Sequence, residues 1–126
     1  MNHTSSFDLD LKYGQIGEES LAKILAGKIE VKTERGTWKS TGNIAIEYMS
    51  RGKNSGLLVT EADHWCTILM DGDIIVNIVI TPVKQMKKLF IKYFRLGSKV
   101  SGGDNNTSKL VLIPLSEILL KGDDVI

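Results

Sequence analysis

The sequence predicts a single α/β domain in which one central mixed β-sheet is flanked by helices. Three observations support this fold class. A chain of 126 residues is long enough for one hydrophobic core, whereas two domains would each be too small. Apolar segments that alternate with period two are interspersed with segments of helical period. Hydrophobic residues make up 42% of the chain and charged residues 25%, which is typical of a folded, soluble protein rather than a disordered one.

The first half of the chain predicts one helix and two strands. Residues 1–6 are polar and are expected to be disordered. Residues 7–11 alternate apolar and charged side chains, which predicts a short edge strand or an extended lead-in. A helix is expected over residues 15–26, where the apolar positions have helical spacing. Residues 28–34 and 44–49 alternate again, and we expect these two strands to pair as a hairpin.

The second half predicts another hairpin and a long helix. Asp71-Gly72 separates two β-branched runs, residues 64–70 and 73–80, which is a strong signal for a tight hairpin. A helix is expected to begin at Pro82, because proline fits the first helical position. Its apolar side, which includes Phe94, is expected to face the core, and its lysines are expected to face solvent.

The chain is expected to end with a loop, a strand and a short helix. Residues 98–108 are rich in Gly, Asn and Ser and are expected to form a mobile loop. A last strand is expected over residues 110–113 and a short helix over residues 117–120. No internal repeat or domain boundary is evident, so residues 1–126 are expected to form one domain.

The composition excludes several classes of protein. No apolar run reaches the ~20 residues that cross a bilayer, and the N-terminal residues lack the apolar segment of a signal peptide. The single cysteine, Cys66, cannot form an internal disulfide, which fits a reducing, cytoplasmic compartment. One cysteine and two histidines cannot build a structural zinc site of the usual kind. A nucleophilic pair of Cys66 with His64 stays open, although no third orienting group is evident.

The net charge of +1 conceals a basic segment. Residues 74–103 contain five lysines and one arginine but no acidic residue. Such a segment is typical of a surface that faces phosphates, although a solvated helix face has the same composition. We expect nucleic-acid contacts from six lysines: Lys39, Lys53, Lys84, Lys87, Lys88 and Lys92. Beside Lys39, Trp38 either stacks on a base or packs over the first hairpin.

Several charged residues converge on the first predicted hairpin. Glu30 and Lys32 alternate with apolar residues, so we expect them on the exposed face of their strand. Glu47 falls on the matching face of the partner strand, about 5 Å away, and Glu18-Glu19 lies on the preceding helix. Carboxylates this close repel each other unless a cation lies between them. Oxygen ligands favour Mg²⁺ or Mn²⁺, and a neighbouring lysine can position a water or stabilise charge on a phosphate.

An acidic residue on a first helix, followed by Glu-x-Lys on a strand, resembles the PD-(D/E)XK nuclease superfamily, which has the restriction-endonuclease-like fold. The tract from Lys28 to Trp65 is also similar to small phage and bacterial members of uncertain role. In those members, a set of short matches recurs together: Glu30-Val31-Lys32, Thr41-Gly42-Asn43, Ile46-Glu47, Ser55-Gly56 and Thr60-x-Ala62-Asp63-x-Trp65. The resemblance covers residues 15–115.

This resemblance implies a metal-dependent DNA endonuclease that hydrolyses phosphodiester bonds. Glu30 and Lys32 match the Glu-x-Lys pair, and Glu19, or alternatively Glu18, matches the helix acid. Glu19, Glu30, Lys32 and Glu47 form the implied catalytic site. Glu19, Glu30 and Glu47 would hold Mg²⁺ or Mn²⁺. The usual pattern has an additional aspartate on a strand before Glu-x-Lys, and no such strand fits here, so Glu47 is expected to substitute for it.

The sequence is also consistent with a second functional class, which is the alternative to the nuclease. If Glu47 does not complete the site, the protein is a non-catalytic nucleic-acid-binding or assembly protein on the same fold. DNA is the expected partner in both cases, without a membrane, and a homodimer stays open. The expected location is the cytoplasm, which would be that of the host if the chain is phage-encoded.

Overall fold

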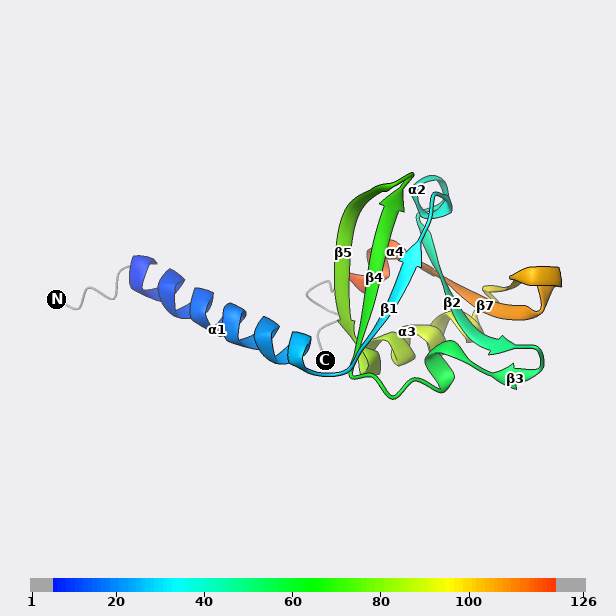
Figure 1. Cartoon of the computed structure of the whole chain (residues 1–126), viewed down its shortest axis with the longest axis horizontal. Helices are drawn as coiled ribbons and strands as arrows, with labels where there is room; N and C mark the ends of the chain where they lie inside the picture. The colour runs from blue at the N-terminus through cyan, green and yellow to red at the C-terminus, as the bar shows by residue number, and fades with distance from the viewer. Residues whose placement is uncertain (1–5, 120–126) are drawn as a thin grey trace.

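The computed structural model describes residues 6–119 of the chain (Figure 1). These residues form one α/β domain with two β-sheets and several helices. The predicted disorder of residues 1–5 lies outside the described residues, whereas Ser6 begins the first helix. The helices are α1 (Ser6–Ala26), α2 (Thr37–Thr41), α3 (Val83–Arg95) and α4 (Leu115–Ile118), with 3₁₀ turns η1 (Gly56–Leu58) and η2 (Asp104–Asn106).

The strands form two sheets rather than the single central sheet that the sequence predicts. A three-stranded mixed sheet has the order β1-β4-β5 and consists of β1 (Ile29–Glu34), β4 (His64–Asp71) and β5 (Ile74–Pro82). A four-stranded antiparallel sheet has the order β3-β2-β7-β6 and consists of β3 (Lys53–Asn54), β2 (Asn43–Ser50), β7 (Ser108–Pro114) and β6 (Lys99–Gly102).

The predicted hairpin of β1 with β2 is wrong. β1 pairs in parallel with β4, beginning with Ile29 opposite His64, whereas β2 pairs antiparallel with β7. The segment between β1 and β2 contains α2, whose Trp38 donates a hydrogen bond from Nε1 to the carbonyl oxygen of Met70 at 2.8 Å. This bond ties α2 to the end of β4, and the chain therefore passes into the second sheet instead of reversing along β1.

The other predicted hairpin is confirmed. β4 and β5 pair antiparallel around Asp71-Gly72. Gly72 has a φ of +59°, the left-handed conformation that glycine adopts at little cost in a tight turn. Helix α3 follows β5 where it is expected, and its buried side chains are Val83, Met86, Leu89 and Phe90.

Two predicted segments differ from the structure. Residues 7–11 belong to α1 instead of an edge strand, because their short alternation is part of a longer helical pattern with polar residues at positions 8, 12, 15, 19 and 23. The expected loop at residues 98–108 contains β6 and η2, and β6 pairs with β7. Pairing with a neighbour thus overrides a Gly- and Asn-rich composition.

The core lies where α3 and both sheets meet (Figure 1). Buried side chains from β2, β4, β7 and α3 form one cluster that includes Ile46, Trp65 and Met86. Tyr48 packs edge-on against Phe90 and Phe94, with ring centroids 5.4 and 5.6 Å apart. The face of the mixed sheet that contacts this cluster is called the inner face below.

The opposite face of the mixed sheet, called the outer face below, carries no charged side chain. The pairing registers assign eleven residues to it: Ile29, Val31, Thr33, His64, Cys66, Ile68, Met70, Ile75, Ile78, Ile80 and Pro82. Val31, Ile75 and Ile78 are 52%, 53% and 55% exposed, respectively. The outer face therefore presents apolar surface to solvent.

Helix α1 is 21 residues long and buries none of its side chains. Figure 1 shows it extending away from both sheets, joined to β1 through Gly27 and Lys28. Seven large hydrophobic side chains of α1 are exposed: Phe7, Leu9, Leu11, Tyr13, Ile16, Leu21 and Leu25. Both α1 and the outer face thus lack the apolar contacts that normally stabilise such elements.

We expect Gly56→Ala to lower the free energy of unfolding by about 2 kcal/mol or more. Gly56 has a φ of +53°, and a Cβ at this position would collide with the backbone carbonyl oxygen of Glu47. A left-handed backbone alone costs a non-glycine residue ~1–3 kcal/mol. Gly52→Ala is the control, because Gly52 has a φ of +79° but no heavy atom within 4 Å of its Cβ position. Urea denaturation measures both, and equal losses would show that the close approach to Glu47 is unimportant.

Candidate functional site

Glu30 and Lys32 lie half-buried on the inner face of the mixed sheet, not on its exposed face as the sequence predicts. The parallel register places Glu30 beside Trp65 and Lys32 beside Thr67, both of which are buried. Because neighbours in register share a face, the two charged side chains follow Trp65 and Thr67 inward. Val31 consequently points outward.

The two charged groups contact each other and their surroundings. Lys32 Nζ lies 3.7 Å from Glu30 Oε2 and 5.8 Å from the centroid of the Trp65 ring. Thr60 donates a hydrogen bond from Oγ1 to Glu30 Oε1 at 3.2 Å. Both side chains keep more than a third of their surface exposed, so water screens part of their attraction. The Glu-x-Lys pair is therefore assembled and accessible.

Two polar atoms beside this pair are buried without a hydrogen-bond partner in the described part of the chain. They are Trp65 Nε1 and Thr67 Oγ1. An unsatisfied buried polar group costs about 1–3 kcal/mol, and folded proteins retain few of them. Together with the ammonium group of Lys32, these atoms place three hydrogen-bond donors along one face next to a carboxylate.

The structure does not bring Glu47 to this pair. Glu47 lies on the side of β2 opposite Tyr48, which is buried in the core. Its carboxylate accepts hydrogen bonds from Ser55 Oγ at 3.0 Å and from Ser108 Oγ at 2.8 Å. The expected proximity to Glu30 depended on the hairpin of β1 with β2, which does not form.

Glu19 is also held apart, because it is exposed on α1. Among residues 6–119, no group of three or more His, Cys, Asp or Glu side chains could hold a metal ion. Glu19, Glu30 and Glu47 as placed do not fit a preformed Mg²⁺ or Mn²⁺ site, which takes several convergent oxygen ligands.

Glu34, the third charged residue on the inner face of β1, links the two sheets. Its Oε1 accepts a hydrogen bond from the Ala45 backbone N–H of β2 at 3.2 Å. Desolvation by burial raises the pKa of Glu34 above its ordinary value of 4.5, and the Ala45 hydrogen bond only partly opposes this rise. The carboxylate thus satisfies a backbone donor of the neighbouring sheet at an electrostatic cost.

The predicted nucleic-acid contacts on α3 are exposed. Lys84, Lys87 and Lys88 all extend into solvent. Lys92 is also exposed, but its Nζ pairs with Glu117 Oε2 of α4 at 3.0 Å. Three of the four predicted α3 lysines therefore have no acidic partner among the ion pairs of residues 6–119.

The predicted contacts outside α3 have other surroundings. Lys39 donates a hydrogen bond from Nζ to Asp71 Oδ2 at 2.7 Å, and this bond and the charge of Asp71 raise the pKa of Lys39. Trp38 packs against the core, so it is not a free platform for a base. Lys53 is exposed on the short edge strand β3.

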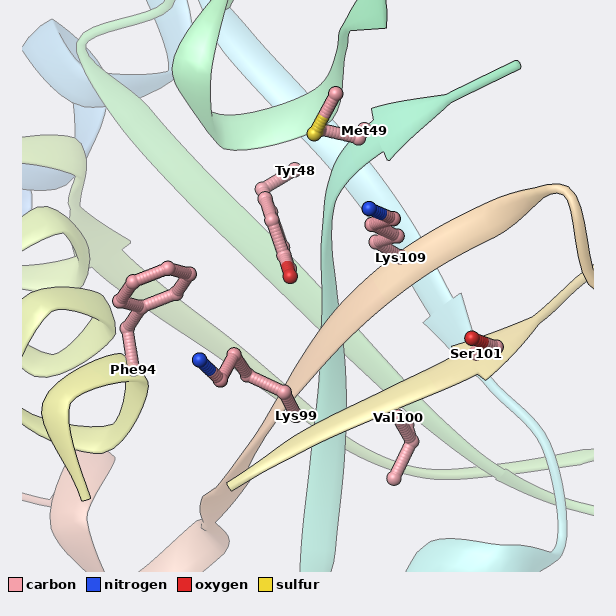
Figure 2. A pocket seen from close by; sticks show the side chains of 7 residues that line it. All are labelled: Tyr48, Met49, Phe94, Lys99, Val100, Ser101 and Lys109. Carbon is pink, nitrogen blue, oxygen red and sulfur yellow. The ribbon is translucent and has the colours of Figure 1, made fainter. Parts of the chain in front are cut away.

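Sequence reasoning missed a hollow of about 460 Å³ beside the C-terminal end of α3 (Figure 2). Lys99, Ser101 and Lys109 line it together with Tyr48 and Phe94, and Met49 and Val100 complete its lining. Lys99 Nζ lies 4.4 Å from the centroid of the Phe94 ring. The sequence contains no signal for this site, because it predicts a loop where β6 forms and a core position for Phe94. In the structure, Phe94 is 37% exposed.

The Cys66–His64 interpretation loses support. The two residues share the outer face, as their spacing in β4 predicts. However, the thiol is buried, and desolvation raises the pKa of Cys66, which disfavours the nucleophilic thiolate.

No protein-family model, curated protein or solved structure matches this chain. Within residues 6–119, none of the helices combines the length and the apolar composition needed to cross a membrane.

We expect Glu34→Gln to raise the melting temperature at pH 7 by about 2–4 °C, corresponding to less than ~1 kcal/mol. The folded-state pKa of Glu34 is raised, so wild-type stability should fall as the pH rises from the ordinary carboxyl pKa through the raised one. Glutamine keeps an acceptor for the Ala45 N–H without the buried charge. The gain should disappear at acidic pH, where Glu34 is protonated. Glu18→Gln on exposed α1 is the control, and a pH-independent gain for Glu34→Gln would contradict this account.

Proposed function

We propose that this protein binds single-stranded nucleic acid, DNA above all, along a basic surface formed by α3 and the adjoining hollow. The observation that carries the proposal is the continuity between the exposed lysines of α3 and the cationic, partly aromatic hollow at the end of the same helix. This surface combines the two features that single strands require, namely cations for phosphates and rings for bases.

The cations of α3 form a stripe along the helix. Lys84, Lys88 and Arg95 are exposed and recur at intervals of four and seven residues, which places them on one side. Lys87 flanks this stripe, and Phe94 lies seven residues further along the same flank. The stripe therefore leads from the start of α3 to the hollow that Phe94 lines, without an intervening acid in residues 74–103.

The hollow has the size and chemistry of a base-binding site. Its volume of about 460 Å³ lies in the ~300–1,000 Å³ range of small-molecule pockets. Phe94 offers a partly exposed ring, and stacking of a base on an aromatic side chain contributes about 1–3 kcal/mol. Lys99 and Lys109 can neutralise the flanking phosphates. A duplex keeps its bases stacked inside, so this arrangement favours a single strand.

We expect Lys87→Ala/Lys88→Ala to weaken single-stranded DNA binding by about tenfold at low salt. Each phosphate contact on a single strand contributes a slope of about −0.7 to the dependence of log K on log salt, so two lost contacts should flatten the slope by about 1.4. Fluorescence anisotropy over a salt series, with labelled single-stranded and duplex DNA, measures both quantities.

The matched control for that experiment is Lys12→Ala/Lys23→Ala, which removes the same charge from exposed α1. It should leave affinity nearly unchanged. If the two double variants lower the affinity equally, binding depends on the net charge of the protein and not on the lysines of α3 in particular. Tighter binding of duplex than of single-stranded DNA would contradict the role of the hollow.

A second candidate function is the metal-dependent endonuclease with a restriction-endonuclease-like core. The observation that favours it is the assembled pair of Glu30 and Lys32, with Trp65 Nε1 and Thr67 Oγ1 unsatisfied beside it. Such donors suit a site in which negative charge develops. Because Glu19 and Glu47 do not converge on the pair, the nuclease is less well supported than nucleic-acid binding without cleavage.

If the second candidate holds, wild-type protein cleaves DNA in the presence of Mg²⁺ or Mn²⁺, and Glu30→Gln and Lys32→Ala each reduce the rate by about 100-fold or more. Glu19→Gln should leave the rate unchanged, because α1 holds Glu19 away from the pair. Thermal melts accompany the assay, and Lys32→Ala should cost no more than ~1 kcal/mol. Wild-type protein that does not cleave, or cleavage that survives both substitutions, rejects the nuclease while leaving the binding proposal intact.

A further inference from the structure

We propose that α1 packs on the outer face of a second copy of this chain, so that two copies exchange their N-terminal helices in a symmetric dimer. This proposal concerns a surface that the proposed nucleic-acid binding does not use. It follows from two uncovered apolar surfaces of the same molecule, each of which needs a partner.

The first uncovered surface is α1 itself. An isolated helix is marginally stable in water even when its sequence favours helix. α1 contains Gly14 and Gly17 in its interior, and each costs roughly 0.5–1 kcal/mol relative to alanine. None of its side chains is buried against the rest of residues 6–119. Packing against another surface is therefore needed to hold α1 as a helix.

The side chains of α1 show how it would pack. Its polar residues form one stripe at helical spacing: Asp8, Lys12, Gln15, Glu19 and Lys23. Apart from Asp10 and Glu18, the remaining circumference is apolar or small, and Leu21 lies near its middle, beside Asp10. An apolar arc this wide is typical of a helix that contacts more than one neighbour.

The second uncovered surface is the outer face of the mixed sheet. It carries no charged side chain, and Val31, Ile75 and Ile78 are each more than half exposed. A sheet with one apolar face in the core and a second apolar face in solvent is unusual. In a strand with one buried face, apolar residues normally alternate with polar residues that point to solvent. Covering by a helix is the common solution in α/β folds.

The connection between the two surfaces favours exchange over self-docking. Only Gly27 and Lys28 separate α1 from β1. The Lys28 carbonyl oxygen accepts hydrogen bonds from the backbone N–H groups of Asp63 at 3.0 Å and His64 at 3.3 Å, which fixes the start of β1. Because the start of β1 is fixed in this way, α1 leaves β1 in a direction that leads away from its own sheet (Figure 1). Short connections of this kind promote exchange of an element between identical chains.

The apolar surface involved is sufficient for a stable dimer. If the seven exposed hydrophobic side chains of α1 and the three of the outer face each lose about 50 Å², each copy buries roughly 500 Å² of apolar surface. That equals the apolar share of a standard interface of about 800 Å² per partner. A two-fold exchange covers both helices and both sheets at once, so assembly stops at two copies.

The first experiment measures oligomeric state by sedimentation velocity across a concentration series. Wild-type protein should sediment with twice the 13.9 kDa mass of the chain. Leu21→Lys in α1 and Val31→Lys on the outer face should each raise the dimer dissociation constant at least tenfold. Gln15→Lys is the matched control, since it adds the same charge to the polar stripe of the same helix. Because α1 buries none of its side chains, Leu21→Lys should leave the melting of the sheets intact when measured on monomers.

The second experiment identifies what α1 touches. Because the only cysteine, Cys66, is buried, the double variant Leu21→Cys/Ile78→Cys places one exposed thiol on α1 and one on the outer face. A short bismaleimide should then link the two positions between chains and give a covalent dimer on a denaturing gel.

Three results would overturn the proposal. If the wild-type protein is monomeric at high micromolar concentration, the proposed dimer does not form. A cross-link within one chain would show that α1 docks on its own sheet. A dimer that tolerates Leu21→Lys as well as Gln15→Lys would place the interface elsewhere.

Discussion

Strand β1 pairs in parallel with β4, and this pairing sets the direction of every β1 side chain. Trp65 and Leu69 of β4 must face the core, because leaving such large apolar side chains in water would cost several kcal/mol. Their partners Glu30 and Glu34 therefore also face inward despite their charge. Lys32 compensates the first carboxylate and the Ala45 N–H compensates the second. The same register turns apolar side chains outward, so the candidate site and the uncovered outer face are two sides of one strand.

Two local signals in the sequence are confirmed by the structure. The turn at Asp71-Gly72 and the whole of α3 form as expected, since both depend on residues a few positions apart. Alternation along β1 identifies two faces of the strand but cannot show which one is buried, because that depends on a partner more than 30 residues away. Charged residues normally mark the exposed face, and β1 departs from this rule because β4 decides its orientation.

The candidate site was likewise predictable only where its residues lie in one segment of the chain. The exposed lysines of α3 follow from composition and helical spacing, which are contained in one segment. The predicted cluster of Glu30 with Glu47 fails because it required a pairing between strands that lie in different sheets. The hollow escapes prediction for the opposite reason: Lys99 and Lys109 become neighbours only because β6 pairs with β7. Sites assembled from several strands are therefore the least accessible to reasoning from one sequence.

Nucleic-acid binding and helix exchange are compatible because they use opposite sides of the fold. Helix α3 packs through Met86 and Phe90 into the core, which the inner face of the mixed sheet also contacts, and the outer face points away from that core. An exchanged helix would therefore leave the stripe of Lys84 and Lys88 in solvent. A dimer would then carry two basic stripes on one rigid particle, and a strand bound to one would meet the other at a high effective concentration. Exchange of α1 would thereby strengthen binding to long single strands more than to short ones, without any new contact to the nucleic acid.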